Sequence, residues 1–281
     1  MTCPKCNVTI DAEMQFCIKC GAVLGDPFET ARARNKAHGV LNKVILWGFL
    51  SVPLLGFVHL VFVVFFGQPI LKANMVGVAA RGHDICCSII AANEARKSAR
   101  LPSIWPKTYL VTTNHPQDIS GRAFMTSTEY FKVLYDEAHV GTDAWTPYLK
   151  RFDYSKVASQ GVPQCPLGQT LTATNNMWLI AANITEEDSD LIPVLITRNV
   201  DVNEIERYIN YGGGHAPDDT RINIGMGDYK SPFEMKAFVC VRKDASTSCS
   251  AGKYPTLRIL FNSQTLPPRD PSKPKIVYLM P

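Results

Sequence analysis

Residues 44–66 read VILWGFLSVPLLGFVHLVFVVFF, and this apolar run decides how the rest of the chain is organised. None of its residues is Lys, Arg, Asp or Glu. A helix of this length extends about 35 Å at 1.5 Å per residue, enough to cross a hydrocarbon core of about 30 Å. Because helices buried in soluble domains are seldom apolar on every side, the run predicts a single transmembrane helix.

The basic residues that flank this run predict its orientation. Arg32, Arg34, Lys36 and Lys43 precede it, whereas only Lys72 and Arg81 follow within a comparable distance. Positively charged flanks usually remain in the cytoplasm. We therefore expect a cytoplasmic N-terminus, a basic juxtamembrane linker over 26–43 and an extracytoplasmic domain over 70–281. His59 lies inside the run; a neutral side chain at a helix–helix contact is the favoured interpretation, and a functional ionisable group is the alternative.

Two Cys-x-x-Cys pairs at the N-terminus predict a metal site. The first is Cys3 and Cys6, and the second is Cys17 and Cys20, followed by Gly21. Each pair can place two thiolates on one side of a tight turn, and two facing pairs give the tetrahedral four-sulfur site typical of Zn²⁺. Since no ligand position is left open, the zinc should be structural. Two disulfides are the alternative, which a reducing cytoplasm disfavours.

The N-terminal segment over 1–25 resembles the zinc-ribbon family. A segment this short cannot bury enough apolar surface to fold alone, so the metal should supply most of its stability. The resemblance implies docking to protein or nucleic acid. The net charge of +4 and pI of about 8.5 include no concentrated Lys/Arg face, so we expect no nucleic-acid partner and allow a cytoplasmic protein partner.

Beyond the membrane run, helical patterns come first and strand patterns follow. We expect helices over 70–99, over 128–137 with Ser127 as N-cap, and over 146–152. We expect strands over 177–182, 192–198, 238–242, 257–261 and 276–279. This order predicts an α+β domain with an antiparallel sheet, with Trp178 and Phe238 in its core.

The cysteines of this region have no metal-ligand spacing. They are Cys86, Cys87, Cys165, Cys240 and Cys249. An odd number leaves at least one thiol free or bridged to another molecule. A disulfide between Cys240 and Cys249 is one option, whereas Cys86 and Cys87 point about 100° apart on a helix and are poor partners.

Several blocks of residues 75–261 carry a family resemblance. They read GHDICCSIIAANEARKSARLPSIWPKT (82–108), STEYFKVLYDEA (127–138), NNMWLIAAN (175–183), LIPVLITRNVD (191–201) and KAFVCVRKD (236–244). In this order they resemble bacterial pseudopilin-like proteins of the type II secretion or prepilin-type group. The resemblance implies a long helix on a small antiparallel sheet, one span in the bacterial inner membrane, and a non-enzymatic role in protein secretion or pilus-type assembly. The implied partners are pilin-like or other membrane subunits, bound through the span and the following helix.

The apolar run departs from the prepilin pattern, in which a Gly cleavage site is followed by a Glu at the fifth mature position. The fifth residue after Gly39 is Val44, and the fifth after Gly48 is Pro53. We therefore expect an uncleaved protein that remains at the membrane as an accessory or minor component.

No catalytic motif is present in the sequence: GxSxG, GxxxxGK[ST] and HExxH are all missing, and we expect no enzyme. Two weaker candidates are a cation site at His215, Asp218 and Asp219, and a calcium site in the acidic turn. That turn contains Glu186, Glu187, Asp188 and Asp190. A Gly-rich loop and a solvated hairpin tip are the favoured interpretations. The alternative function is a membrane-anchored ligand-binding or sensing module with a zinc-ribbon adaptor, which requires a concave pocket.

Overall fold

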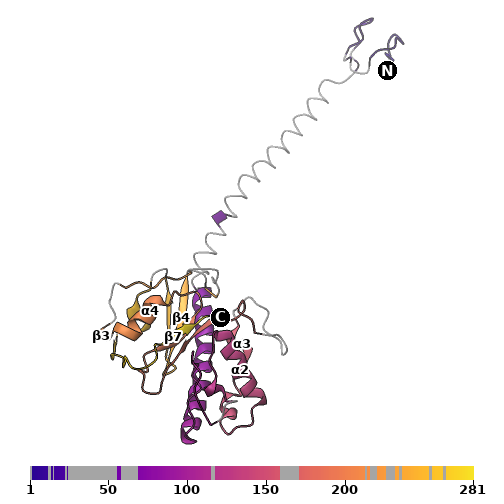
Figure 1. Cartoon of the computed structure of the whole chain (residues 1–281). Coiled ribbons are helices and arrows are strands. Elements are labelled where there is room, and N and C mark those ends of the chain that lie inside the picture. Colours follow the sequence, from indigo (N-terminus) through magenta and orange to yellow (C-terminus); the bar gives the residue numbers. More distant parts are fainter. Residues whose placement is uncertain are drawn as a thin grey trace. The chain divides into compact units, whose positions relative to one another are not determined.

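The computed structural model (Figure 1) describes most of the chain. It covers residues 2–11, 14, 16–22, 24, 56–57, 69–114, 118–158, 171–212, 214–215, 220–225, 232–233, 236–252, 255–261 and 264–281. The chain divides into two compact units, Met1–Gln68 and Pro69–Pro281. Within the predicted transmembrane run only Gly56 and Phe57 are described, and both are helical and exposed. The linker over 26–43, His59 and Cys165 lie outside the described residues.

The second unit begins with a helix over Pro69–Ser98, close to the prediction of 70–99. Among the described residues it is the one helix that is both long enough and apolar enough to cross a membrane. However, half of its most apolar 18-residue window is buried inside the unit. The buried side chains recur at helical spacing: Met75, Val78, Ala79, Ile85, Cys86, Ile89 and Ala92. One buried side and one exposed side are typical of a helix that packs on a protein core.

A left-handed residue ends this helix where the sequence predicts its end. Arg100 has a φ of 57°, and its N–H donates to the Lys97 carbonyl over 3.0 Å. The Leu101 N–H donates to the Arg96 carbonyl over 2.9 Å. These two bonds satisfy carbonyls that the last helical turn would otherwise leave unpaired, and Pro102 then prevents the helix from continuing.

The core of the second unit is a five-stranded antiparallel sheet in the order β5-β4-β2-β1-β7. Its strands are β1 (Trp178–Ala182), β2 (Pro193–Thr197), β4 (Ala237–Arg242), β5 (Thr247–Ala251) and β7 (Val277–Leu279). Every residue of β1, β2 and β4 is buried, so both faces of the central sheet are covered. Trp178 and Phe238 are fully buried, as predicted. The long helix and the antiparallel sheet fit a mixed α+β class.

The strand predicted over 257–261 is wrong, because this segment forms the short helix α5 (Leu257–Leu260). A strand would point Leu257, Ile259 and Phe261 to one side. The structure instead buries Leu257, Leu260 and Phe261 and leaves Ile259 exposed, which is helical spacing. Short apolar runs do not distinguish the two structures by pattern alone.

Strand β5 was missed, since its sequence TSCSA has few of the residues that favour strands. It forms at the sheet edge because a tight turn folds it back onto β4. In that turn Ala245 has a φ of 64°, and the Arg242 N–H donates to the Ser246 carbonyl over 2.8 Å. The pairing places Cys240 opposite Ser248 and Cys249 opposite Val239.

Helix α2 (Ser127–Val140) starts one residue earlier than predicted and extends three residues further. Thr126 caps it: its side chain accepts from the Glu129 N–H over 3.1 Å. The predicted cap, Ser127, instead donates its hydroxyl to the Trp178 carbonyl over 2.8 Å, which ties the helix start to β1. The helix predicted over 146–152 is a shorter 3-10 turn, η2 (Thr146–Leu149), and α3 (Tyr154–Val157) follows.

The remaining short elements are η1 (Ile119–Gly121), α4 (Asn203–Arg207), the π-helical turn η3 (Tyr208–Gly212), β3 (Gly214–His215) and β6 (Thr265–Leu266). Part of the predicted Gly-rich loop is therefore ordered, because β3 pairs with β6. The side chain of Glu206 in α4 accepts the Tyr278 N–H over 2.6 Å, which joins α4 to strand β7.

The first helix and the sheet meet most closely at Gly82. A Cβ built there would lie 2.7 Å from the Trp178 side chain and 2.7 Å from that of Val241. Real Cβ atoms do not approach other atoms so closely, so only glycine fits here. Gly82 thus allows the helix to lie directly across β1 and β4.

We predict that Gly82→Leu lowers the free energy of unfolding of the second unit by about 1–3 kcal/mol or more, because the added side chain overpacks this contact. Ala80→Leu is the matched control, since Ala80 is exposed on the same helix. Chemical denaturation of the full chain in detergent, followed by near-ultraviolet circular dichroism, measures both. Equal stabilities for the two variants would contradict the close contact.

Candidate metal centre

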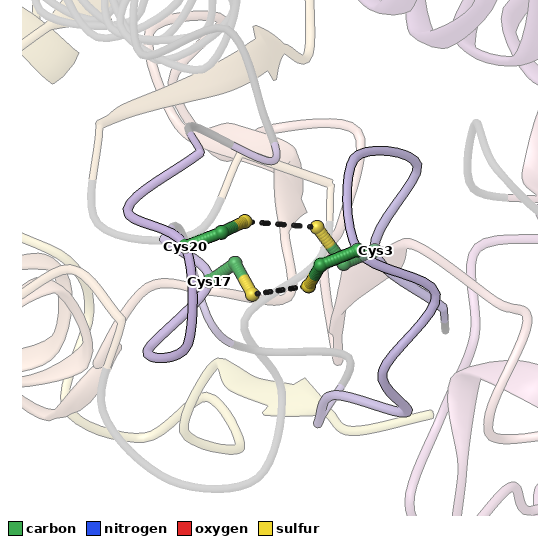
Figure 2. Close-up of side chains that lie close together, drawn as sticks. Cys3, Cys17 and Cys20 are labelled. Carbon is green, nitrogen blue, oxygen red and sulfur yellow. Dashed lines mark hydrogen bonds between the residues drawn. The ribbon is translucent and has the colours of Figure 1, made fainter.

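The sulfur atoms of Cys3, Cys6, Cys17 and Cys20 converge in the first unit, as Figure 2 shows for the labelled residues. All four lie within 4.8 Å of one another. The Cys3 and Cys20 sulfurs are 3.6 Å apart, and those of Cys6 and Cys17 are 3.5 Å apart. A tetrahedral site with Zn–S bonds of about 2.3 Å separates its sulfurs by about 3.8 Å, whereas a disulfide bond is about 2 Å long. The spacing therefore fits a metal and not two disulfides.

Each pair of cysteines lies on the same kind of backbone turn. The Asn7 N–H donates to the Cys3 carbonyl over 2.9 Å, and the Gly21 N–H donates to the Cys17 carbonyl over 2.8 Å. Asn7 has a φ of 48° and Gly21 a φ of 66°. These are residue types that tolerate the left-handed conformation, so the turn that follows each pair forms at little cost.

The head around this site has very little apolar core of its own. Among its described residues only Cys3, Ile10 and Cys17 form the buried cluster, and Ala22 and Leu24 pack against it. Two of the buried residues are ligands themselves. The bonds that a metal would form with the four sulfurs are therefore the main stabilising interactions available here.

The protein environment favours ionisation of one thiol of the set. Burial raises the pKa of the Cys17 thiol, but hydrogen bonds from the backbone N–H groups of Cys20 and Lys19 outweigh burial and lower the pKa to about 6. A thiolate is the form that binds a metal. For Cys6 a hydrogen bond from the Val8 N–H lowers the pKa, yet burial and the neighbouring thiols raise it to about 12. Metal binding must therefore release protons from this site.

Residues 2–24 match the zinc-ribbon domain family. The match covers the predicted head and all four cysteines, and it agrees with the sulfur geometry and with a structural Zn²⁺. Comparisons of the chain with curated proteins and with solved structures found no match, so the resemblance to pseudopilins receives no support from them.

The acidic turn between β1 and β2 forms ion pairs and not a cluster of carboxylates. Each acidic side chain has its own basic partner: Glu186 with Lys97, Glu187 with Lys273, Asp188 with Arg269, and Asp190 with Lys243. Calcium needs several oxygen ligands that converge. In the part of the chain that the structure describes, the N-terminal cysteines are the one cluster of metal-binding side chains. The expectation of a solvated hairpin tip is wrong for Asp188, whose side chain is buried.

The second candidate cation site was His215 with Asp218 and Asp219. His215 belongs to strand β3, whereas Asp218 and Asp219 lie outside the described residues. The structure therefore does not show whether these three residues lie close together, and this prediction stays untested.

The cysteines of the second unit that the structure describes are free thiols. The Cys240–Cys249 disulfide is wrong, because Cys249 pairs with Val239 and alternation along the strands then places the two thiols on opposite faces. Cys86 and Cys87 also remain unpaired with each other, as expected from their angle on the helix. The Cys87 sulfur lies 3.4 Å from the His83 Nε2.

Sequence reasoning missed two ion pairs that contain a buried arginine side chain. Arg269 pairs with Asp188, 81 positions away in the chain, at an Nε–Oδ1 distance of 2.9 Å. Arg96 pairs with Asp118 and is fully buried. No local sequence pattern predicts either ion pair, because the two partners of each pair come from separate segments that lie close together only in the folded structure.

We predict that the purified full chain binds one zinc ion per molecule. Cobalt substitution should give the intense visible bands of tetrahedral thiolate coordination. Cys17→Ser should abolish both signals, because a hydroxyl does not replace a thiolate ligand, whereas Cys249→Ser should leave them unchanged. Inductively coupled plasma mass spectrometry and absorption spectra measure these outcomes. Full zinc content in Cys17→Ser would rule out the site.

A second prediction concerns the buried Asp188–Arg269 pair. Arg269→Leu should lower the free energy of unfolding by about 3–5 kcal/mol, because it leaves a buried carboxylate unpaired. Lys273→Leu is the control: it breaks the pair with the exposed carboxylate of Glu187 and a 3.3 Å hydrogen bond to Thr185, and should change stability little. Urea denaturation of both variants tests this.

The same pair predicts a pH dependence. Burial raises the pKa of the Asp188 carboxyl, but hydrogen bonds from Arg269 and from the Thr185 N–H outweigh it, so the pKa lies below its ordinary value of 3.8. The pair therefore stabilises the fold above pH 3.8, and this contribution is lost as the pH falls through the lowered pKa. Arg269→Leu should remove this part of the acid dependence; an unchanged acid profile would contradict it.

Proposed function

We propose that this protein is a single-pass, non-enzymatic membrane protein that takes part in protein secretion or pilus-type assembly through a pseudopilin-like domain. In this proposal residues 44–66 cross the bacterial inner membrane, the zinc ribbon lies in the cytoplasm, and residues 70–281 lie outside it. Two features support the proposal: the composition of 44–66, and a long helix that packs on an antiparallel sheet directly after it.

The observation that carries the proposal is the exposed side of the Pro69–Ser98 helix. Near its start Ile70 is 51% exposed and Val76 is 67% exposed, although the opposite side of the same helix is buried. Both apolar side chains follow closely on the proposed membrane span. In our proposal they contact the helix of another membrane subunit, so that this protein joins an assembly through its span and the first turns of this helix.

The zinc ribbon has a separate role in this proposal. Cys3, Cys6, Cys17 and Cys20 hold a structural Zn²⁺ that orders the head. Phe16 and Ile18, on and beside the second cysteine turn, are 57% and 80% exposed. An ordered turn with exposed apolar side chains is a suitable docking point for a cytoplasmic protein. The mild net charge and the lack of a basic patch in the sequence argue against nucleic acid.

A second candidate function is a membrane-anchored ligand-binding or sensing module, with the zinc ribbon as its cytoplasmic adaptor. A cavity of about 510 Å³ in the second unit favours it. This volume is in the range of small-molecule sites, about 300–1,000 Å³.

Photo-crosslinking in living cells tests the assembly proposal. A photoreactive amino acid at Val76 should capture a membrane subunit with a pilin-like sequence, identified by mass spectrometry. The same amino acid at Met125, which is 80% exposed but lies outside this helix, is the matched control and should not capture it. Equal capture at both positions, or capture of cytoplasmic proteins alone at the zinc ribbon, would contradict an assembly role.

A further inference from the structure

The first helix of the second unit carries a histidine and a cysteine one turn apart, beside the tight turn that joins β4 to β5. His83 and Cys87 are four positions apart, so their side chains lie on the same side of the helix. Both residues are exposed. The Cys87 sulfur lies 3.4 Å from the His83 Nε2. A nitrogen and a sulfur that can both bind a metal therefore lie next to each other at the surface.

The protein holds the other ring nitrogen of His83. Its Nδ1 donates to the Ala245 carbonyl over 2.9 Å. Because a carbonyl oxygen only accepts, Nδ1 carries a proton, and in the neutral ring the free lone pair is then on Nε2. Histidines that bind metals in proteins almost always donate their second ring nitrogen to a carboxylate, a carbonyl or water. The imidazole is thus oriented with its metal-binding nitrogen beside the Cys87 sulfur.

Contacts around the pair fix the backbone that carries it. Ala245 has a φ of 64°, and its N–H donates to the Arg242 carbonyl over 2.9 Å, so the carbonyl that holds the imidazole belongs to an ordered turn. The buried thiol of Cys86 donates to the same Arg242 carbonyl over 3.4 Å. Gly82 lies against the sheet, as described above. A site on an anchored helix keeps its geometry better than a site on a loop.

The separation of the two atoms fits one bound metal ion. Bonds of about 2.0 Å to nitrogen and about 2.3 Å to sulfur, at a tetrahedral angle, separate the two ligand atoms by about 3.5 Å. The observed separation is 3.4 Å. The neighbouring sulfurs of the zinc ribbon are similarly 3.5 and 3.6 Å apart. An ion can therefore replace the thiol proton between the two atoms without a rearrangement of the helix.

A reactive, nucleophilic thiol is the alternative role for such a pair, and the surroundings of Cys87 disfavour it. Burial, followed by the charge of Asp84, raises the pKa of the Cys87 thiol above its ordinary value of 9.0. Reactive cysteines have a lowered pKa instead. A metal ion deprotonates the thiol that coordinates it, so a metal site does not need a lowered pKa. Asp84 pairs with Lys156 over 3.0 Å, and we do not count it as a ligand.

We propose that His83 and Cys87 form a second metal site, which binds a borderline or soft transition-metal ion such as Zn²⁺ or Cu⁺. Imidazole and thiolate ligands suit these ions, whereas Mg²⁺ and Ca²⁺ prefer oxygen ligands. A four-coordinate ion would keep two positions for water or for donor groups of another molecule. The site differs in this respect from the zinc ribbon, whose four cysteines leave no position open.

This inference is independent of both candidate functions, and failure of the crosslinking experiment at Val76 would leave it standing. With two protein ligands, the site binds its ion more weakly than the four-cysteine ribbon does. Metal-free buffer therefore empties it during purification, and the purified chain keeps the one zinc ion of the ribbon.

Alkylation of Cys87 tests the proposal in the full chain in detergent, with its zinc ribbon loaded. Iodoacetamide reacts with a free thiolate, and a bound metal ion blocks this reaction. Added Zn²⁺ at ten times its dissociation constant should slow labelling of Cys87 about tenfold, because the metal-free fraction falls by that factor. Mg²⁺ should have no effect. Mass spectrometry of the labelled peptides measures the rates, and the exposed free thiol of Cys249 is the internal control.

Two histidine substitutions separate a metal site from a lone thiol. His83→Gln removes the nitrogen ligand and should weaken the Zn²⁺ protection of Cys87 about tenfold or more, since even changes outside the ligand shell cause losses of this size. His139→Gln is the matched control. His139 is exposed on α2 and its Nδ1 likewise bonds a carbonyl, that of Tyr135, over 2.9 Å. Near-ultraviolet circular dichroism checks that both variants keep the fold.

Cobalt titration of the zinc-loaded chain identifies what completes the site. Co²⁺ bound to Cys87 should give a thiolate charge-transfer band in the near ultraviolet, which Cys87→Ser should abolish and Cys249→Ser should retain. Saturation at one ion per chain would identify water, and saturation at one ion per two chains would identify donors from a second copy.

Two results would overturn the proposal. One is equal Zn²⁺ protection of Cys87 in His83→Gln and in the parent chain. The other is unchanged labelling of Cys87 at Zn²⁺ concentrations up to about 1 mM, which would leave less than about 4 kcal/mol of binding free energy for the pair.

Discussion

The second unit depends on the close packing of one helix across a sheet. The Pro69–Ser98 helix has a glycine, Gly82, at its nearest approach to β1 and β4, and this glycine lets apolar side chains on either side of it reach the core. Helix α2 then attaches to the same sheet through the Ser127 hydroxyl and the Trp178 carbonyl. A larger residue at position 82 would separate the helix from the sheet.

Long polar side chains have a structural role in this unit beside the apolar packing. Arg242 lies in a central strand, is 3% exposed, and donates its Nε to the Leu260 carbonyl over 2.7 Å, which holds α5 in place. Arg269 likewise joins the acidic turn to the segment before β7. Buried guanidinium groups must be matched by acceptors, and these matches fix how the irregular segments lie on the sheet.

The zinc ribbon is stabilised in a different way. It has two similar turns, a small buried cluster and four converging sulfurs, so a metal would replace the hydrophobic core that so short a segment lacks. A rigid head of this kind keeps its exposed side chains in a fixed arrangement. That property is what the proposed docking role requires, whichever of the two candidate functions the second unit performs.

The sequence by itself determined the features that depend on local spacing. The Cys-x-x-Cys pairs predicted the metal site, helical spacing predicted the first helix, and apolar runs predicted β1, β2, β4 and β7. The predictions from the sequence were wrong where contacts with distant segments decide the structure. Pairing with β4 made a strand of the polar segment Thr247–Ala251, and burial of Leu257 and Leu260 made a helix of a strand-like segment. The ion pairs of the acidic turn and the contact between Arg96 and the Trp145 ring also depend on distant segments. Their partners are far apart in the chain, so only the tertiary structure could bring them within contact distance, where burial makes their pairing necessary.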